Sequence, residues 1–165
     1  MSYASPVSGP SDVFLIRHAE AVAASLELRD SQRHLTAHGR AQALALGDRL
    51  RWHDCEPTHI WTSPLVRAVQ TAELVANMVN AKCMIETQVA LSPDADTTPL
   101  VAALALLPEA SVVMLFGHQP TITQLASQIV GRDVAMLANA EAVRVHHERV
   151  RWRFRWDAEA PTPKP

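Results

Sequence analysis

Two uninterrupted apolar runs, each followed by a histidine, are the features that most constrain this chain. The runs and their ends are Val13–Ile16 with Arg17-His18, and Val112–Phe116 with Gly117-His118. Short continuous apolar runs are typical of strands buried on both faces, as in parallel sheets. In open α/β sheets the working residues lie just past the carboxyl ends of such strands. If the two strands are parallel neighbours, both histidines lie at the same edge of the sheet.

Signals for helices lie between and after these strands. Thr36 is a candidate N-cap for a helix that extends to Asp54. Ser63-Pro64 combines a preferred N-cap residue with a proline at the first helical position, and Thr98-Pro99 repeats this signal. A further helix follows the second apolar strand and ends at Gly131, because glycine readily closes a helix.

Shorter strands complete the pattern, at Thr58–Thr62, at Lys82–Ala90, and in a C-terminal hairpin formed by Ala142–His146 and Val150–Trp156. The alternation of strands and helices predicts a three-layer α/β/α sandwich with a mixed, mostly parallel sheet and a C-terminal antiparallel hairpin. We expect a flexible N-terminus over residues 1–12, a single domain over residues 13–157, and a flexible, proline-rich tail over residues 158–165.

The bulk composition argues against several classes of protein. The 165 residues carry a formal net charge of −2, which gives no general attraction to nucleic acid or to an anionic membrane. No apolar run approaches the roughly 18 residues of a membrane helix. Cys55 and Cys83 lack the spacing of metal ligands, which fits a reducing compartment. We therefore expect a soluble cytoplasmic monomer that binds neither nucleic acid nor membrane.

Basic side chains gather at the predicted sheet edge. Arg17 adjoins His18, and Arg67 falls in the first turn of the helix predicted to begin at Ser63. The free N–H groups at that helix N-terminus favour phosphate, and Gly117 lets the backbone approach a ligand closely. Fixed positive charge beside an imidazole favours an anion and repels a metal cation. The pattern predicts an anion site without metal, whereas His18 taken alone could equally be a surface loop histidine.

Four segments resemble signatures of the histidine phosphatase superfamily, the phosphoglycerate mutase-like proteins. They are RHAEA at 17–21, RHLTAHG at 33–39, SPLVRAVQTA at 63–72 and GHQP at 117–120. The segments follow the family's order and spacing, and the resemblance covers nearly the whole chain from Val13 to Trp156. The short chain and the form of the first segment are similar to the phosphohistidine phosphatase (SixA-type) branch.

The resemblance implies that His18 is the nucleophile that becomes phosphorylated. It implies that Arg17, Arg67 and His118 bind the phosphoryl oxygens, with Ser63 and Gly117 beside them. Nearby arginines push an imidazole toward its neutral form, which leaves a ring nitrogen free to attack phosphorus. Two guanidiniums and a second imidazole can neutralise the transferred group without Mg²⁺ or another cofactor. Water then hydrolyses the phosphorylated His18.

The chain departs from the family pattern at the proton donor. Many relatives place a glutamate two residues after a leucine that follows the peripheral strand, and here Leu91-Ser92-Pro93 puts proline at that position. Glu20, Asp94 and Asp96 remain as candidate donors. A P–N bond needs a dedicated acid less than an alcohol ester does, and the chain has no insertion long enough for a lid.

We therefore expect a metal-independent phosphatase that acts on phosphohistidine of a signalling or phosphorelay protein. A phosphomonoesterase of the same family, acting on a small phosphate ester, stays open as an alternative. So does a non-catalytic module that binds phosphoproteins. The three arginines at positions 151, 153 and 155 form either a solvated strand face or a docking patch for an acidic partner.

Other phosphatase classes and a metal site fit the chain less well. Asp94–Thr98 matches the D-x-D-x-T pattern of haloacid dehalogenase-type phosphatases, but Pro93 interrupts the strand that this mechanism needs. Neither cysteine is followed six residues later by the arginine of a cysteine phosphatase. A zinc site built on His18 and His118 lacks a clear third ligand.

Overall fold

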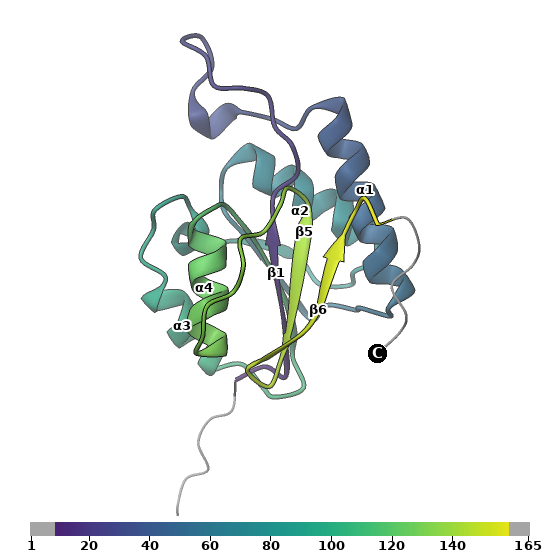
Figure 1. The fold of residues 1–165 in the computed structure, drawn as a ribbon, viewed down its shortest axis with the longest axis vertical. Helices are drawn as coiled ribbons and strands as arrows, with labels where there is room; N and C mark the ends of the chain where they lie inside the picture. Colours follow the sequence, from purple (N-terminus) through teal and green to yellow (C-terminus); the bar gives the residue numbers. More distant parts are fainter. Residues whose placement is uncertain (1–8, 159–165) are drawn as a thin grey trace, which may run out of the picture.

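The computed structural model describes residues 9–158, which form one six-stranded sheet between two layers of helices (Figure 1). The strands are β1 (Asp12–Arg17), β2 (His59–Thr62), β3 (Ile85–Thr87), β4 (Val112–Gly117), β5 (Glu141–His146) and β6 (Arg149–Arg155). They are arranged in the order β3-β2-β4-β1-β5-β6. The first four strands are parallel, and β5 and β6 form an antiparallel hairpin beside β1. The predicted fold class is confirmed.

Four α-helices cover the two faces of the sheet. They are α1 (Ala37–Trp52), α2 (Val66–Met78), α3 (Thr98–Ala105) and α4 (Thr121–Val130), with short 3₁₀ helices η1 (Asp30–Gln32) and η2 (Val89–Leu91). In Figure 1, α3 and α4 lie together on one side of the sheet, and α1 and α2 lie on the other. Their apolar stripes form two separate clusters of buried side chains, one on each face.

Strand β1 contributes to both clusters, which explains its uninterrupted apolar run. Phe14 and Ile16 pack with α1 and α2, whereas Val13 and Leu15 pack with α3 and α4. All four side chains are buried, and each buried side chain of this size stabilises the fold by about 1.5–3 kcal/mol. Strand β4 pairs with β1 in parallel, and Arg17 lies opposite Gly117. The residues that follow the two strands therefore leave the same edge of the sheet.

Helix α1 begins as the sequence predicts. The hydroxyl of Thr36 accepts a hydrogen bond from the main-chain N–H of Gly39 at 2.9 Å, and Thr36 is the N-cap. Gly39 is required here by space, because a Cβ at this position would lie 2.0 Å from the carbonyl oxygen of Glu20. The beginning of α1 is thus packed directly against the segment that follows His18.

Helix α2 begins later than the sequence predicts. Its N-cap is Leu65 and its first residue is Val66, so the prediction of a cap at Ser63 with Pro64 as the first helical residue is wrong. The main-chain N–H of Ser63 donates to the carbonyl of Phe116, which keeps Ser63 aligned with the sheet. Its hydroxyl contacts His118. The Ser63 hydroxyl thus bonds to the distant His118 and, at 3.3 Å, to Leu65 N–H before the helix begins.

Other strand boundaries differ from the prediction because the chain turns tightly where these strands end. The peripheral strand is shorter than Lys82–Ala90: β3 ends at Thr87, and the chain turns into η2 through bonds such as Leu91 N–H to the carbonyl of Gln88. The β5–β6 hairpin turns at His147 and Glu148, whose φ angles of 45° and 60° suit the tight turns of twisted hairpins.

Residues 1–8 and 159–165 lie outside the described part of the chain, so the expected flexible ends and domain limits stay predictions. Strand β1 begins at Asp12, one residue before the predicted domain limit. The Asp12 carboxylate accepts a 2.7 Å hydrogen bond from Arg144. Among the helices of residues 9–158, none has the length and hydropathy to cross a membrane.

Candidate functional site

His18 is held at the carboxyl end of β1 by main-chain and side-chain bonds. Its N–H donates to the carbonyl of Gly117 at 3.0 Å, and its own carbonyl accepts from Ala140 N–H and Asn139 Nδ2, both at 3.3 Å. The ring nitrogen Nδ1 lies 2.7 Å from the carbonyl oxygen of Ala19. A carbonyl only accepts, so Nδ1 carries the proton. Nε2 therefore keeps its lone pair.

His118 follows β4, and its ring lies beside that of His18, with 5.0 Å between the ring centroids. Its Nε2 is 2.8 Å from the hydroxyl oxygen of Ser63, and that oxygen also accepts from Leu65 N–H at 3.3 Å. We assign the Ser63 proton to the bond with Nε2 of His118, and the ring proton of His118 then lies on Nδ1.

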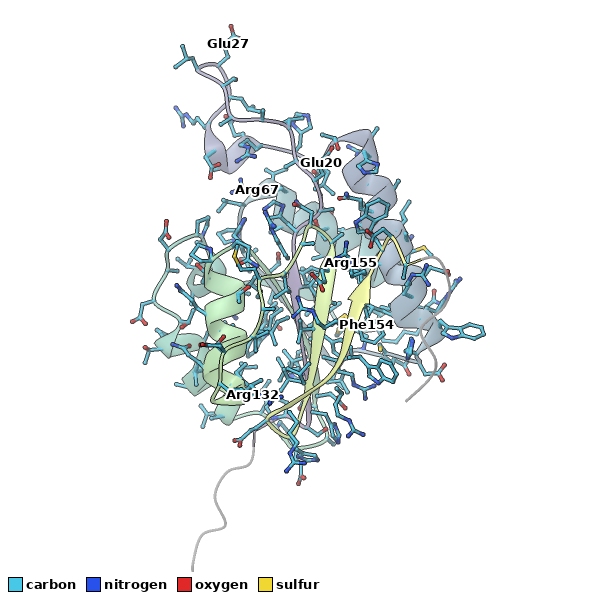
Figure 2. All side chains as sticks on the ribbon, viewed as in Figure 1. Glu20, Glu27, Arg67, Arg132, Phe154 and Arg155 are labelled. Atoms are coloured by element: carbon cyan, nitrogen blue, oxygen red, sulfur yellow. The ribbon has the colours of Figure 1, made fainter. Side chains whose placement is uncertain are left out.

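Two guanidinium groups flank the histidines. Arg17 Nη1 donates to the carbonyl of Leu137 at 3.0 Å. Arg67, in the first turn of α2, is buried, and its two terminal nitrogens donate to the carbonyl and the carboxylate of Asp30 at 2.8 and 3.2 Å. Figure 2 shows Arg67 close below the segment that carries η1, at the carboxyl end of β1. The structure brings Arg17, His18, Arg67 and His118 together at one edge of the sheet, and their roles stay predictions.

Three buried N–H groups at this edge have no partner within residues 9–158. They are Nε of Arg17, Nε of Arg67 and Nδ1 of His118. A buried donor without an acceptor costs about 1–3 kcal/mol, and such orphans are rare in folded proteins. All three belong to residues beside His18. Together they form a set of donors suited to the oxygens of an anion.

Both histidines are neutral at physiological pH. Burial, reinforced by the charges of Arg67, Arg17 and Arg33, lowers the pKa of His18 to about 4. Burial and the neighbouring His18 and Arg67 lower the pKa of His118 to about 3. A neutral imidazole with a free Nε2 beside fixed positive charge can act as a nucleophile toward a bound anion.

Sequence reasoning missed two charged residues of this edge. Arg33 acts on His18 through its charge, and its Nε donates to the carbonyl of Val22 at 2.8 Å. Asp30 joins Arg33 and Arg67, with its two carboxylate oxygens 3.0 and 3.2 Å from them. Arg33 opens the RHLTAHG segment and could have been considered, but Asp30 lies in a polar loop without any local signal.

The candidate proton donors are engaged in other contacts. The carboxylate of Glu20 accepts from the hydroxyl of Thr36 at 2.7 Å, on the side of α1 (Figure 2). Asp96 accepts from Thr98 N–H at 2.9 Å at the start of α3, and this bond lowers the pKa of its carboxyl. Asp94 has a φ of 56°, and its N–H donates to Thr121 at the start of α4. Their role as donors stays a prediction.

Gly117 lies at a tightly packed position. A Cβ on it would lie 3.3 Å from the carbonyl oxygen of Leu91 and 3.4 Å from Cδ1 of Ile122, so η2 and α4 pack closely against the end of β4. A direct contact between Gly117 and phosphate stays a prediction. Within residues 9–158 no group of three or more His, Cys, Asp or Glu side chains is arranged to hold a metal ion.

The three arginines of β6 differ in their contacts and in their exposure. Arg153 donates to the buried carboxylate of Glu141 at 2.8 Å and to the carbonyls of Ala135 and Met136. It therefore supports the loop whose Leu137 carbonyl holds Arg17. Arg155 pairs with Asp157, and Arg151 is exposed.

Comparison with known proteins identifies the class. Residues 13–91 match the model of the histidine phosphatase superfamily (branch 1). The chain is 26% identical over 133 residues to phosphohistidine phosphatase SixA of Escherichia coli strain K12, which covers 79% of this chain and 81% of that protein. The chain belongs to the histidine phosphatase superfamily. It is an enzyme of that superfamily, and SixA is its relative over most of both sequences.

Solved structures of SixA proteins share the fold of this histidine phosphatase. The structure of SixA complexed with tungstate matches with a TM-score of 0.80 and 25% sequence identity. The match covers 88% of this chain and 97% of the SixA chain. The putative SixA of Agrobacterium tumefaciens has a TM-score of 0.80 and 25% identity, with 89% and 99% covered. The haloacid dehalogenase pattern at Asp94–Thr98 finds no structural support, because Asp94 follows η2 instead of a buried strand.

Proposed function

We propose that this enzyme removes phosphate from phosphohistidine on a signalling or phosphorelay protein, through a covalent phosphohistidine at His18. The observation that carries the proposal is the set of three buried N–H donors around a neutral His18 with a free Nε2. Phosphoryl transfer needs in-line positioning and neutralisation of charge more than it needs covalent chemistry from the protein. Arg17, Arg67 and His118 supply both.

The reaction divides into two displacements at phosphorus. Nε2 of His18 attacks the phosphorus, the P–N bond of the substrate breaks, and its electron pair leaves with the substrate imidazole, which takes up a proton. Nε of Arg17, Nε of Arg67 and Nδ1 of His118 bind the phosphoryl oxygens. Water then attacks the phosphorus of phosphorylated His18, inorganic phosphate leaves, and Nε2 regains its lone pair.

The acids around the site favour a P–N substrate. Asp30 is the carboxylate that contacts the site arginines, and its bond with Arg33, followed by that with Arg67, lowers its pKa. Such a carboxyl is a poor proton donor. An alkoxide leaving group requires a strong donor in the transition state, whereas an imidazole leaves with less help. The similarity to SixA supports the same substrate class.

The surroundings of the site also favour a protein substrate. The segment between β1 and α1 rises beyond the carboxyl end of β1 (Figure 1). Residues 23–27 of this segment are exposed, and Leu26 is fully exposed. A macromolecular partner that presents a phosphohistidine at this edge meets that surface first. A cytoplasmic location and a monomeric state stay predictions of the sequence.

The test compares phosphate release, in excess EDTA, from a phosphohistidine-bearing phosphotransfer protein and from a panel of small phosphate esters. We expect fast release from the protein and slow turnover of the esters. His18→Ala should abolish release, and the exposed His34→Ala is the matched control. Fast turnover of esters alone would move the function to a small-molecule phosphatase. Binding of the phosphoprotein without an acid-labile phosphoryl-enzyme would indicate a binding module.

A further inference from the structure

Asp30 connects two arginines of the phosphate site. Its carbonyl oxygen accepts from Nη1 of Arg67 at 2.8 Å, and one carboxylate oxygen accepts from Nη2 at 3.2 Å. The other carboxylate oxygen accepts from Nη1 of Arg33 at 3.0 Å. Main chain and side chain of one residue therefore hold one end of the Arg67 guanidinium. The charge of Arg33 is tied to the same carboxylate.

The contacts leave the opposite edge of Arg67 free. A guanidinium presents five N–H groups in a rigid plane, and Asp30 uses only the terminal nitrogens Nη1 and Nη2. Nε of Arg67 is buried and has no partner within residues 9–158. The Asp30 side chain is 57% exposed, whereas that of Arg67 is 5% exposed. The carboxylate thus lies on the outer side of Arg67, and Nε lies inside.

We propose that Asp30 is a positioning residue, which fixes the outer edge of Arg67 so that its Nε edge faces the phosphoryl group. Its other carboxylate oxygen accepts from Arg33, which anchors the Asp30 side chain in place against Arg67. This inference rests on the proposed function, because it assigns Asp30 to the same phosphate site. Arg67 touches the phosphoryl group, and Asp30 acts only through Arg67.

The test uses Asp30→Ala and Asp30→Asn, with Asp48→Ala as a matched control. Asp48 pairs with Arg51 at the same i,i+3 spacing, and its side chain is 59% exposed, but it contacts no residue of the site. Two quantities are measured: kcat and KM with the phosphoprotein, and the affinity for tungstate from calorimetry. Thermal unfolding of each variant checks that the fold is kept, and Asp30→Asn serves if Asp30→Ala unfolds.

Asp30→Ala should lower kcat/KM and tungstate affinity roughly 10-fold, below the 10²-fold that an ångström of misplacement can cost. The loss should fall mainly on kcat, and Asp30→Asn should lie between wild type and Asp30→Ala. Asp48→Ala should stay within about 2-fold of wild type, as expected for an exposed pair. In an Arg67→Ala background, Asp30→Ala should have no further effect, because the group that it positions is gone.

Unchanged or tighter tungstate binding in both Asp30 variants would overturn the proposal, since the carboxylate would then compete with the anion. A full loss from Asp30→Ala in the Arg67→Ala background would overturn it as well. The calorimetric arm separates this proposal from the proposed function. If wild type does not hydrolyse phosphohistidine but Asp30→Ala still weakens tungstate binding, the assignment of Asp30 holds and the substrate assignment fails.

Discussion

Folding should expel protons from His18 and His118, and this makes the stability of the enzyme depend on pH. In the unfolded chain a histidine has its ordinary pKa of 6.5, and burial lowers the pKa to about 4 for His18 and to about 3 for His118. Between these values the unfolded state binds more protons, so the free energy of unfolding falls as the pH drops from 6.5 toward 4. At pH 5 the loss relative to pH 8 is about 2 kcal/mol for each histidine.

His18→Asn isolates the share of one histidine. An asparagine amide can donate to the carbonyl of Ala19 as Nδ1 of His18 does, but it does not titrate. Whatever its stability at pH 8, the variant should lose about 2 kcal/mol less than wild type between pH 8 and pH 5. The assay is urea unfolding at pH 5, 6, 7 and 8, with His118→Asn measured in parallel. The exposed His34→Asn controls for the substitution itself.

Equal losses in wild type and His18→Asn over this range would refute the reasoning. Such a result would mean that His18 takes up a proton in the folded protein as readily as in the unfolded chain. Nε2 would then be protonated near pH 6, and His18 would not be the neutral nucleophile that the mechanism needs. Stability therefore tests the protonation state of the nucleophile without any substrate.

Two further substitutions test the packing and the tautomer of the site. Gly39→Ala places a Cβ 2.0 Å from the Glu20 carbonyl oxygen and should lower the free energy of unfolding by about 3 kcal/mol or more. Gly47→Ala places a Cβ 2.5 Å from Cβ of Met78 and should cost less in the same thermal unfolding assay, because the overlap is smaller. Equal costs would show that the Glu20 contact does not limit the packing of α1. Ser63→Ala removes the hydrogen bond to His118. The loss of about 1–1.5 kcal/mol should lower kcat about 10-fold. An unchanged kcat in steady-state kinetics would show that Ser63 does not fix the ring of His118.

The two central strands, β1 and β4, could be predicted because a strand buried on both faces is a continuous apolar run. A strand with one exposed face alternates apolar and polar residues instead. The runs before His18 and His118 therefore indicated both the strands and the sheet edge where the site lies. Their in-register pairing became visible only in the fold, since Arg17 and Gly117 are neighbours across two strands far apart in the chain.

Predictions from local sequence patterns failed where a side chain bonds to a residue that is distant in the sequence. Ser63-Pro64 has the chemistry of a helix start, but the Ser63 hydroxyl is used by His118, and α2 begins at Val66. Asp30 was missed for a related reason. Its partner Arg67 lies on another element, and no periodicity or motif connects the two positions. Residues that act through a long-range contact leave little trace in sequence.

The position of β1 in the sheet has a consequence for how the enzyme forms during synthesis. Both neighbours of β1, β4 and β5, come from the later part of the chain, so the first apolar strand cannot pair until residue 112 or beyond has left the ribosome. Contacts of such high sequence separation form slowly and leave apolar segments exposed in the meantime. The apolar residues of β1 therefore stay without their sheet neighbours until β4 emerges. The nascent chain should gain phosphatase activity late in synthesis and in a single step.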